Sequence, residues 1–298
     1  MKVLKVVNAA TKASVIISTY GRCACLRAAL DSLLAQSPDE DEIVIIDQNE
    51  RIDKDVLDMI EQNKERIRHI RVDYINGVRA RNEGLKNARG EIAIYCDDDI
   101  IAGKDFIKNH VRNYSDPAVG GVAGRVITEI DTVVDRPNGV GRIRKWDGKV
   151  TSNFNADFKT EVEHAWGCNM SFRRELLIRA GGFDERLKGT QSFDDASICF
   201  AIRSLGYKIV FDPAACARHL LAPTGGCRDM VFSEKMFWYY HNFMIFYLKH
   251  MRKVFFPIFL ARQISGILRR GIILKDPKAL YCGMKGLIRG FIDSFDRI

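Results

Sequence analysis

The sequence has 298 residues, of which 47% are hydrophobic and 28% are charged. This length can bury a substantial core, and this balance excludes a chain that is disordered throughout. The net charge of +8 lies at one end, because Lys and Arg outnumber Asp and Glu by twelve to four from Phe232 to Ile298 and are equal in number to them before it. The basic C-terminal segment therefore needs its own explanation.

The spacing of the cysteines and the lack of long apolar segments indicate the cellular compartment of the protein. No two of the eight cysteines have the spacing of a zinc knuckle or a redox dithiol, which favours free thiols in a reducing cytosol over disulfides or a metal site at Cys23 and Cys25. The first 13 residues lack the apolar core of a signal peptide, and no window has the roughly 18 uninterrupted apolar residues of a membrane span. We expect a cytoplasmic location.

The first half of the chain alternates between short apolar strands and helices. Strands are expected at 14–18, 43–46, 70–74 and 92–96, with helices from Leu26 to the stop at Ser37-Pro38, over about 53–66, and from Gly77 to Gly90. Continuous apolar strands separated by helices are typical of a parallel sheet covered on both faces. The fold class is therefore expected to be α/β, with ligands bound beyond the carboxyl ends of the strands.

The second half is less regular. We expect a strand at 118–127, a polar loop over 128–163, and a strand, a helix and a Gly-Gly turn within 164–187. A helix follows Asp194-Asp195, and a strand at 207–211 leads into a loop that carries His219.

Three adjacent carboxylates, Asp97, Asp98 and Asp99, follow the strand at 92–96. Charged residues often solvate a turn, but no turn needs three of them, and like charges this close repel one another. A divalent cation such as Mg²⁺ or Mn²⁺ would neutralise the carboxylates and could bind the phosphates of a substrate. The sequence therefore predicts a hard-cation site at the ligand edge of the sheet.

Five segments appear in an order that resembles family 2 of the inverting, nucleotide-sugar-dependent glycosyltransferases with the GT-A fold. They are VIISTYGR, IVIIDQN, ARNEGLKNARGEIAIYCDDD, GCNMSFRRELLIRAGGFDE and FDDASICFAIRSLGYKIVFDP. The resemblance covers about residues 13–220 and implies a Rossmann-like, mostly parallel sheet flanked by helices. We expect a catalytic domain over 1–225, with a nucleotide-sugar-binding half (1–117) and an acceptor-binding half (118–225), and a helical basic appendage over 226–298.

The resemblance implies which residues surround the donor nucleotide. Gln48 stands where the family usually has a second acid beside Asp47, so at this position the sequence departs from the family pattern. A cation beside a nucleoside diphosphate is also expected on charge grounds, although a solvated helix face is the alternative for Arg79 and Arg81. The implied donor contacts are Thr19 and Tyr20 for base and ribose, Asp47 for the base, and Arg81, Asn82, Asp97 and Asp98 for the rest of the nucleotide.

The resemblance also implies a metal site. Asp97 and Asp99 match the outer residues of the family's DxD motif, with Asp99 as the direct ligand and Asp97 near the ribose or a metal-bound water. His219 falls where related enzymes place a histidine near the metal or the diphosphate, and a packed or surface histidine is the alternative. The expected cofactor is Mg²⁺ or Mn²⁺.

The catalytic and acceptor residues are expected in the second half. Inversion needs a base that removes the proton of the acceptor hydroxyl. The resemblance implies that Asp195 is this base and that Asp194 is a structural or acceptor-side neighbour, whereas a helix cap explains one carboxylate better than both. Trp166, Gly167 and Asn169 match the segment that lines the acceptor side in the family.

The basic segment keeps apolar residues at helical spacing from Met236 to Met251 and continues in aromatic, aliphatic and basic style to Arg270. A helical cap packed on the catalytic domain accounts for part of this pattern. The basic surplus predicts in addition an amphipathic surface on an anionic membrane, at the inner face of the cell membrane. Nucleic acid is the alternative partner of a basic patch, but the chain has no recognition motif and its candidate site is acidic.

These patterns and the family resemblance together imply a metal-dependent inverting transferase that moves one sugar from a UDP- or dTDP-sugar to a lipid-linked or cell-surface glycan precursor. The Gln-x-x-Arg-Trp signature of processive synthases is absent, so a single addition is favoured over polymerisation. A non-catalytic carbohydrate- or nucleotide-binding scaffold is one alternative, although it would not need both Asp97–Asp99 and Asp194-Asp195. A nucleotidyltransferase is the other, but residues 19–25 hold one Gly and one Arg rather than a Gly-rich basic loop.

Overall fold

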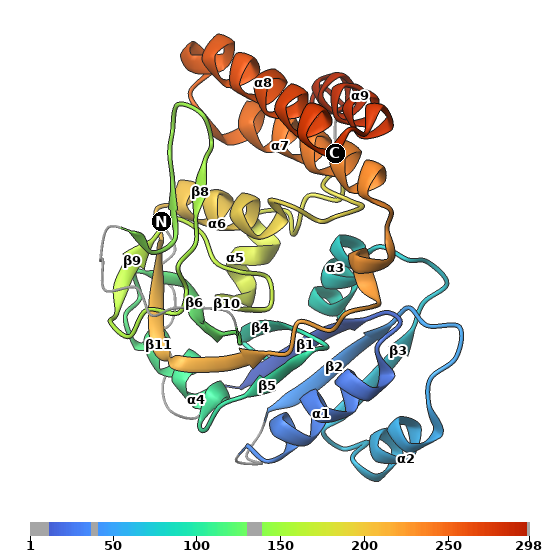
Figure 1. Ribbon diagram of the computed structural model, residues 1–298. Coiled ribbons are helices and arrows are strands. Elements are labelled where there is room, and N and C mark those ends of the chain that lie inside the picture. The colour runs from blue at the N-terminus through green and yellow to red at the C-terminus, as the bar shows by residue number, and fades with distance from the viewer. Residues whose placement is uncertain (1–11, 37–40, 130–138, 297–298) are drawn as a thin grey trace.

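The computed structural model describes residues 12–36, 41–129 and 139–296, and within them a nine-stranded mixed sheet lies between two layers of helices (Figure 1). Its strands are β1 (Ala13–Thr19), β2 (Glu42–Asp47), β3 (Ile67–Arg71), β4 (Ile92–Asp97), β5 (Ile100–Ala102), β6 (Val119–Ile127), β9 (Thr160–Val162), β10 (Asn169–Arg173) and β11 (Lys208–His219). They run in the order β3-β2-β1-β4-β10-β6-β11-β5, and β9 pairs with β11 beside this path. The α/β prediction is confirmed.

The four N-terminal strands, β1 to β4, are parallel to one another, and this arrangement gathers their polar ends. Thr19 on β1 lies opposite Asp47 on β2, and Ser18 lies opposite Asp97 on β4. Strand β10 runs antiparallel between β4 and β6 and brings the second half of the chain onto the same sheet. A separate two-stranded hairpin, β7 (Arg142–Ile143) and β8 (Val150–Thr151), lies in the loop region.

Two helical layers cover the faces of the sheet because side chains alternate along each strand. Ile16 and Tyr95 point into the core beneath one layer, whereas Ile17 and Ile94 point into the core beneath the other. The first layer contains α3 (Gly77–Asn87), α5 (Arg174–Arg179) and α6 (Asp194–Ser204), and the second contains α1 (Cys23–Leu34), α2 (Lys54–Gln62) and α4 (Phe106–Val111), which is followed by the 3₁₀ turn η1 (Arg112–Ser115).

Two strand predictions were wrong in position. The strand expected at 70–74 spans Ile67–Arg71, because Ile67 pairs with Ile43 and the polar residues after it complete an edge strand. The strand expected to end at Phe211 continues to His219, since Pro213 falls where the β11–β6 register shifts, and a bulge tolerates a residue without an N–H. His219 therefore ends a strand rather than lying in a loop. The expected helix stop at Ser37-Pro38 lies outside the described residues.

The C-terminal segment forms a helical cap above α6. It consists of α7 (Phe232–His250), α8 (Phe256–Leu274) and α9 (Pro277–Asp293), with the 3₁₀ turns η3 (Gly226–Asp229) before α7 and η4 (Lys253–Phe255) before α8. Side chains of α7 such as Met236 and Phe243 are buried among the three helices, so this apolar stripe is core rather than membrane surface. Gly286 and Gly290 let α9 approach the carbonyls of Phe237 and His241 on α7 closely.

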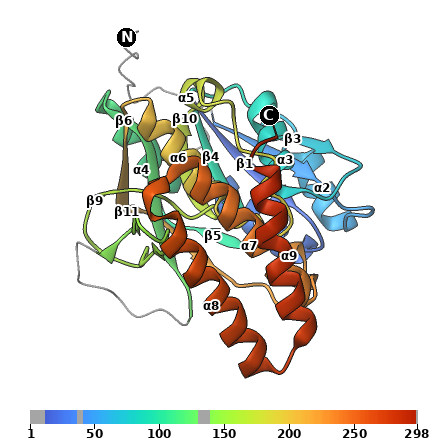
Figure 2. The same cartoon turned by 90° about the horizontal axis from the view of Figure 1, so that it is seen from above.

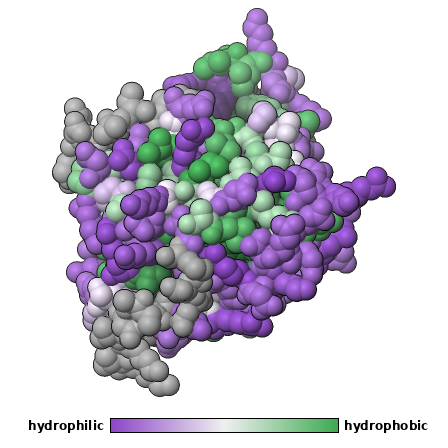
Figure 3. Space-filling view, turned by 90° about the horizontal axis from the view of Figure 1, so that it is seen from below, coloured by the Kyte–Doolittle hydropathy of each residue, from purple (hydrophilic) through white to green (hydrophobic). Residues whose placement is uncertain are grey.

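The two last helices of the cap project from the molecule. Seen from above, α8 and α9 form a hairpin whose turn extends beyond the outline of the other elements (Figure 2). The opposite side of the molecule is mainly hydrophilic, with smaller groups of hydrophobic side chains (Figure 3). No described helix has the length and apolarity to cross a bilayer. All eight cysteines are free, as predicted.

Candidate active site

A cleft of about 1110 Å³ opens at the carboxyl ends of the parallel strands. Its walls come from the ends of β1, β4 and β11, the starts of α3 and α6, the loop before α6, and the first turns of the cap. Sequence-predicted residues from both halves of the chain meet here, as expected for this kind of sheet. They are Tyr20, Arg81, Asp97, Asp98, Trp166, Gly167, Asp194, Asp195 and His219.

Asp97, Asp99 and His219 form a cluster whose candidate ligand atoms all lie within 4.8 Å of one another. His219 reaches the cluster because the end of β11 pairs with β5, directly after the aspartates. Its Nε2 lies 3.0 Å from Oδ1 of Asp99. Burial alone would raise the pKa of Asp99, but the hydrogen bond and charge of His219 hold that pKa below its usual range. Two carboxylates and an imidazole are a donor set that suits a divalent cation.

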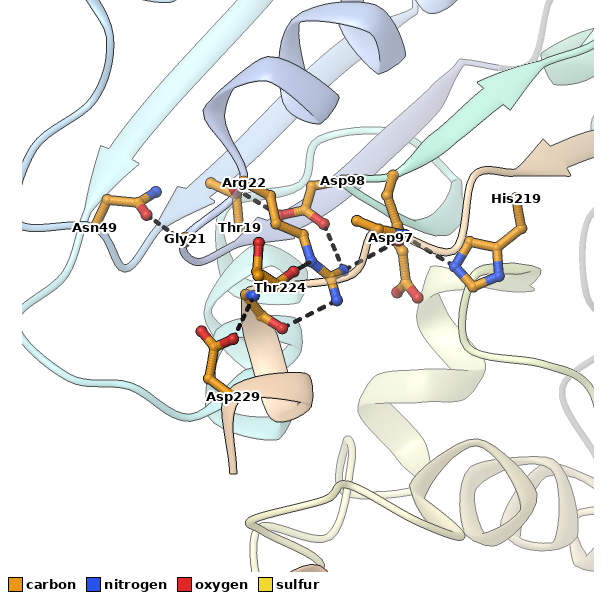
Figure 4. Close-up of polar contacts among 12 residues, drawn as sticks. Thr19, Gly21, Arg22, Asn49, Asp97, Asp98, His219, Thr224 and Asp229 are labelled. Atoms are coloured by element: carbon orange, nitrogen blue, oxygen red, sulfur yellow. Dashed lines mark hydrogen bonds and ion pairs between the residues drawn. The ribbon is translucent and has the colours of Figure 1, made fainter. Parts of the chain in front are cut away.

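Arg22 neutralises the other side of the aspartate triplet, a role that the sequence patterns did not indicate. Its Nη1 lies 3.1 Å from Oδ1 of Asp98 and 3.3 Å from Oδ2 of Asp99. The same guanidinium donates to the carbonyls of Thr224 and Gly225, so it extends between the triplet and the loop before α7 (Figure 4). This ion pair explains in part how three adjacent carboxylates are tolerated.

Asp98 is held by the protein itself. Thr19 Oγ1 donates a 2.8 Å hydrogen bond to its Oδ2 while Arg22 contacts its other oxygen. Burial raises the pKa of Asp98 to about 6, and Arg22 only partly opposes this. Thr19 is itself fully buried and does not line the cleft. Thr19 and Asp98 therefore support the end of β4, and both carboxylate oxygens of Asp98 have partners within the protein.

Asp47 lies below the cleft and is fully buried. Its Oδ1 accepts hydrogen bonds from the backbone N and Nδ2 of Asn49, and its Oδ2 lies 2.9 Å from Nε2 of His69. Burial opposes ionisation, but these hydrogen bonds lower the pKa of Asp47. Gln48, beside it, lines the cleft and accepts a hydrogen bond from the backbone of Asn76 at the start of α3. His69 was missed because its strand was expected to begin later.

Arg81 links the metal cluster to the second carboxylate pair. Its buried guanidinium forms a hydrogen-bonded ion pair with Asp194 and lies 3.7 Å from Oδ1 of Asp97. Burial would lower the pKa of Arg81, but the surrounding carboxylates raise it above its ordinary value. Gly167 leaves the space for this side chain, because a Cβ there would clash with the guanidinium.

Asp195 is the more exposed member of the carboxylate pair, although both line the cleft. Asp194 is committed to Arg81 and to the backbone N of Asp195, whereas Asp195 accepts from the backbone N of Ala196 and Gly167. Asp195 lines both the main cleft and a second pocket of about 680 Å³. Burial raises the pKa of both carboxyls, that of Asp194 to about 6. A raised pKa makes a carboxylate a better proton acceptor at neutral pH.

Phe193, immediately before the pair, has a left-handed backbone with φ of +71°, which is rare for a bulky residue. Its ring stacks on Phe243 of α7 at a centroid distance of 4.5 Å. The cap therefore holds the residue that aims the two carboxylates.

Asn82 and Asn169, like Thr19 and Asp47, do not line the cleft. Asn82 binds the backbone of Phe183 and the carboxylate of Glu185, and so anchors the turn after α5. Asn169 is fully buried, where it contacts Nε2 of His110 and donates to the carbonyls of Arg125 and Ala215. Both side chains point into the scaffold, because neighbours distant in sequence satisfy them there. Trp166 does line the cleft, with its indole N–H donating to Ser152.

Comparison with known proteins gives consistent results. A family model described as "Glycosyl transferase family 2" matches residues 14–181. A glucosyl-dolichyl phosphate glucuronosyltransferase of Haloferax volcanii is 26% identical over 219 residues, which cover 70% of this chain and 69% of that protein.

Solved structures share the fold. The S. aureus protein TarS (residues 1–349), in complex with UDP-GlcNAc, has a TM-score of 0.63 and 18% identity over 96% of this chain and 82% of its own. The mannosyltransferase PcManGT from Pyrobaculum calidifontis, in complex with GDP-Man and Mn²⁺, has a TM-score of 0.57 and 20% identity over 95% of this chain and 87% of its own.

Proposed function

The chain belongs to glycosyl transferase family 2, and from that premise we propose that it transfers one sugar, with inversion, from a nucleoside-diphosphate sugar to an acceptor hydroxyl. The observation that carries this proposal is the pairing of two sites in one cleft. The cluster of Asp97, Asp99 and His219 and the carboxylate of Asp195 line or adjoin the same space. Asp97 and Asp99 come from the first half of the chain, and His219 and Asp195 come from the second.

The donor diphosphate is proposed to lie beside the metal cluster, with Asp97, Asp99 and His219 as the ligands of a Mg²⁺ or Mn²⁺ ion. When bound, such an ion neutralises charge on the departing diphosphate. The Mn²⁺ in the complex of the Pyrobaculum mannosyltransferase supports a divalent ion. Arg81 is proposed to contact the nucleotide and also to position Asp194 and Asp97 through its ion pairs.

Asp195 is proposed to accept the proton of the acceptor hydroxyl while the hydroxyl oxygen attacks the anomeric carbon opposite the diphosphate. Its raised pKa and its place between the main cleft and the second pocket support this role. Tyr20 and Gln48, which line the cleft, are proposed to contact the nucleoside. For Asp47 to hydrogen-bond a uracil or thymine base, the base would replace Asn49 or His69 as its partner.

The acceptor is proposed to be a lipid-linked or cell-surface glycan precursor, and the cap is proposed to rest on the inner face of the cell membrane. The substrate in the name of the Haloferax relative supports the first proposal. Exposed apolar side chains on the cap, among them Ile272 and Phe295, support the second. Residues 1–225 are accordingly proposed as the catalytic domain, with its halves at 1–117 and 118–225, and 226–298 as the appendage. The core of the appendage is formed mainly by its own three helices and also includes Ile143, Phe193 and Ala196 of the sheet domain.

Calorimetric titration of UDP, dTDP and GDP tests the donor site, first with Mn²⁺ and then with EDTA. We expect UDP or dTDP to bind only with the metal, and Asp97→Asn and Asp99→Ala to abolish binding. Asp58→Asn, an exposed change on α2, is the control and should bind as the wild type does. A chain that binds none of the three nucleotides with Mn²⁺ present would overturn the proposal.

Turnover tests the base. With a membrane extract as the source of acceptor, Asp195→Asn should lower the release of nucleoside diphosphate from the donor by about a hundredfold or more, because general-base catalysis contributes about that much. Metal-dependent nucleotide binding should remain. Undiminished turnover in Asp195→Asn would favour the scaffold alternative or a different base.

A further inference from the structure

Two further pockets continue from Asp195 along the cap. The second pocket shares Trp166, Ser192, Phe193 and Asp195 with the main cleft. A third pocket, of about 640 Å³, shares Ser192, Tyr239, Arg269 and Arg270 with the second. A path lined by side chains therefore runs from the proposed base to the end of α8.

Two cationic side chains, Arg269 and Arg270, lie where the second and third pockets meet. Among the described residues, no carboxylate lies within ion-pair distance of Arg269 or Arg270, whereas Arg262 on the same helix pairs with Asp147 at 3.1 Å. Nη1 of Arg270 lies 3.3 Å from the hydroxyl of Tyr240. Both arginines line the second and the third pocket, and the planar fork of a guanidinium matches the oxygens of a phosphate.

Beyond the arginine pair the path becomes apolar. Phe232 and Met236 of α7 and Ile273 and Leu274 of α8 line the third pocket. Ile272, Ile273 and Leu274 are 72%, 66% and 52% exposed at the end of α8, close to the projecting turn of Figure 2. An exposed apolar group of this kind next to a cation pair fits an amphiphile better than a polar ligand.

We propose that Arg269 and Arg270 bind the phosphate or diphosphate of a lipid-linked acceptor, whose apolar chain follows the third pocket and whose sugar hydroxyl reaches Asp195. The order of the groups along the path supports this proposal. The apolar wall would contact the lipid chain, the two arginines would bind the phosphate, and the carboxylate of Asp195 would accept the proton of the hydroxyl. This inference rests on the proposed transferase function and adds a specific acceptor subsite to it.

Binding of decyl phosphate below its micellar concentration tests the subsite, measured by calorimetry on the full chain with Mn²⁺ and the nucleotide that binds. The wild type should bind decyl phosphate at least tenfold more tightly than the uncharged decyl maltoside. The double variant R269Q/R270Q should lose about tenfold or more in affinity for decyl phosphate, because charge-assisted hydrogen bonds are lost. The double variant K278Q/K285Q, which removes equal charge from exposed positions of α9, should stay within about twofold of the wild type.

Equal loss in both variants, or equal binding of decyl phosphate and decyl maltoside, would overturn the subsite. The nucleotide titration separates this failure from failure of the proposed function, because R269Q/R270Q should keep metal-dependent nucleotide binding. A wild-type chain that binds the nucleotide but not decyl phosphate overturns the inference alone. One that binds decyl phosphate but no nucleotide overturns the transferase function on which the inference rests.

Sedimentation with phosphatidylglycerol vesicles distinguishes an acceptor phosphate from bulk lipid headgroups. We expect R269Q/R270Q to lower vesicle binding no more than K278Q/K285Q does, since all four positions are exposed and only Arg269 and Arg270 line the second and third pockets. Vesicle binding lost only in R269Q/R270Q would assign the arginines to headgroups and overturn the acceptor assignment.

Discussion

The charged side chains at the carboxyl ends of the strands, the proposed donor end of the sheet, differ from Arg269 and Arg270 of the C-terminal cap in whether they have ion-pair partners. At the donor end the buried ionisable groups have partners inside the protein: Arg22 with Asp98 and Asp99, Arg81 with Asp194. On the cap, Arg269 and Arg270 lie exposed on α8 beside bare apolar side chains. The proposed donor site is thus preorganised by its own charges, whereas no carboxylate among the described residues pairs with Arg269 or Arg270 on the cap.

The contrast extends to how the two regions are held together. Parallel strands fix the positions of the donor residues through a backbone register, whereas the cap depends on helix packing and on a few contacts with the sheet domain. One contact is the stack of Phe193 on Phe243, and another is the ion pair of Lys249 with Asp184. The four variants below probe each side of this contrast.

The largest effect is expected from breaking the internal charge balance of the donor side. Arg81→Met leaves Asp194 and Asp97 without their cation, so we expect the free energy of unfolding to fall by about 3–5 kcal/mol. Urea unfolding measures this change. Arg79→Met, an exposed position on the same helix whose guanidinium lies over Tyr74, is the control and should change stability little. Similar losses in both variants would mean that the buried network does not stabilise this end.

The packing of the cap is the next target. In Gly286→Ala the added Cβ would overlap the carbonyl of Phe237, and because backbone cannot move aside easily we expect a loss of about 3 kcal/mol. Gly266→Ala on α8 gains the same helix propensity, but its Cβ meets only the flexible end of Tyr240, so it should be neutral or stabilising by up to about 1 kcal/mol. Thermal unfolding of the two variants tests this difference. A stable Gly286→Ala would show that α7 and α9 can separate without cost.

Asp184 connects the two regions, and its contribution should depend on pH. Burial would raise the pKa of Asp184, but hydrogen bonds from Arg186 and Lys249 lower it to about 2. A lowered folded-state pKa means that the stabilisation is present above the unfolded pKa of about 4 and is lost as the pH falls toward 2. We expect Asp184→Asn to cost about 2 kcal/mol at pH 7 and almost nothing at pH 2. Unfolding curves at a series of pH values measure the difference, and a loss independent of pH would point to packing instead.

The sequence predicted those features that depend on local pattern, such as strands and the polar residues directly after them. Apolar runs predicted β1, β2 and β4, and the position of Asp97–Asp99 directly after a strand predicted that these carboxylates lie at the edge of the sheet where the cleft opens. Partners distant in the chain were not predictable from pattern. Arg22 contacts Thr224, which lies 202 positions away, and only the folded loop brings them together.

Motif position also has limits. Asn82 and Asn169 occupy family motif positions, yet their side chains bind backbone and histidine groups within the scaffold. A motif indicates which strand end or helix a residue is on, but the side-chain direction depends on hydrogen-bond partners from other segments. The same holds for α7, whose helical stripe was predicted correctly, although periodicity alone did not reveal that the stripe faces the cap core and that the exposed apolar residues are on α8 and α9.

The smallest effect is expected at Thr19, at the end of β1, where a variant tests whether this residue supports Asp98 or contacts the nucleotide. Thr19→Val keeps the shape but removes the hydrogen bond to the buried Asp98, so we expect a loss of about 1 kcal/mol in the free energy of unfolding, restored in Thr19→Ser. Nucleotide affinity should fall only modestly, since Thr19 does not line the cleft. If nucleotide affinity instead falls more than tenfold while stability is unchanged, Thr19 contacts the nucleotide, as the family resemblance implies. In that case the donor end, like the cap, would keep a polar group for its ligand, and the contrast between the two regions would hold for their charges only.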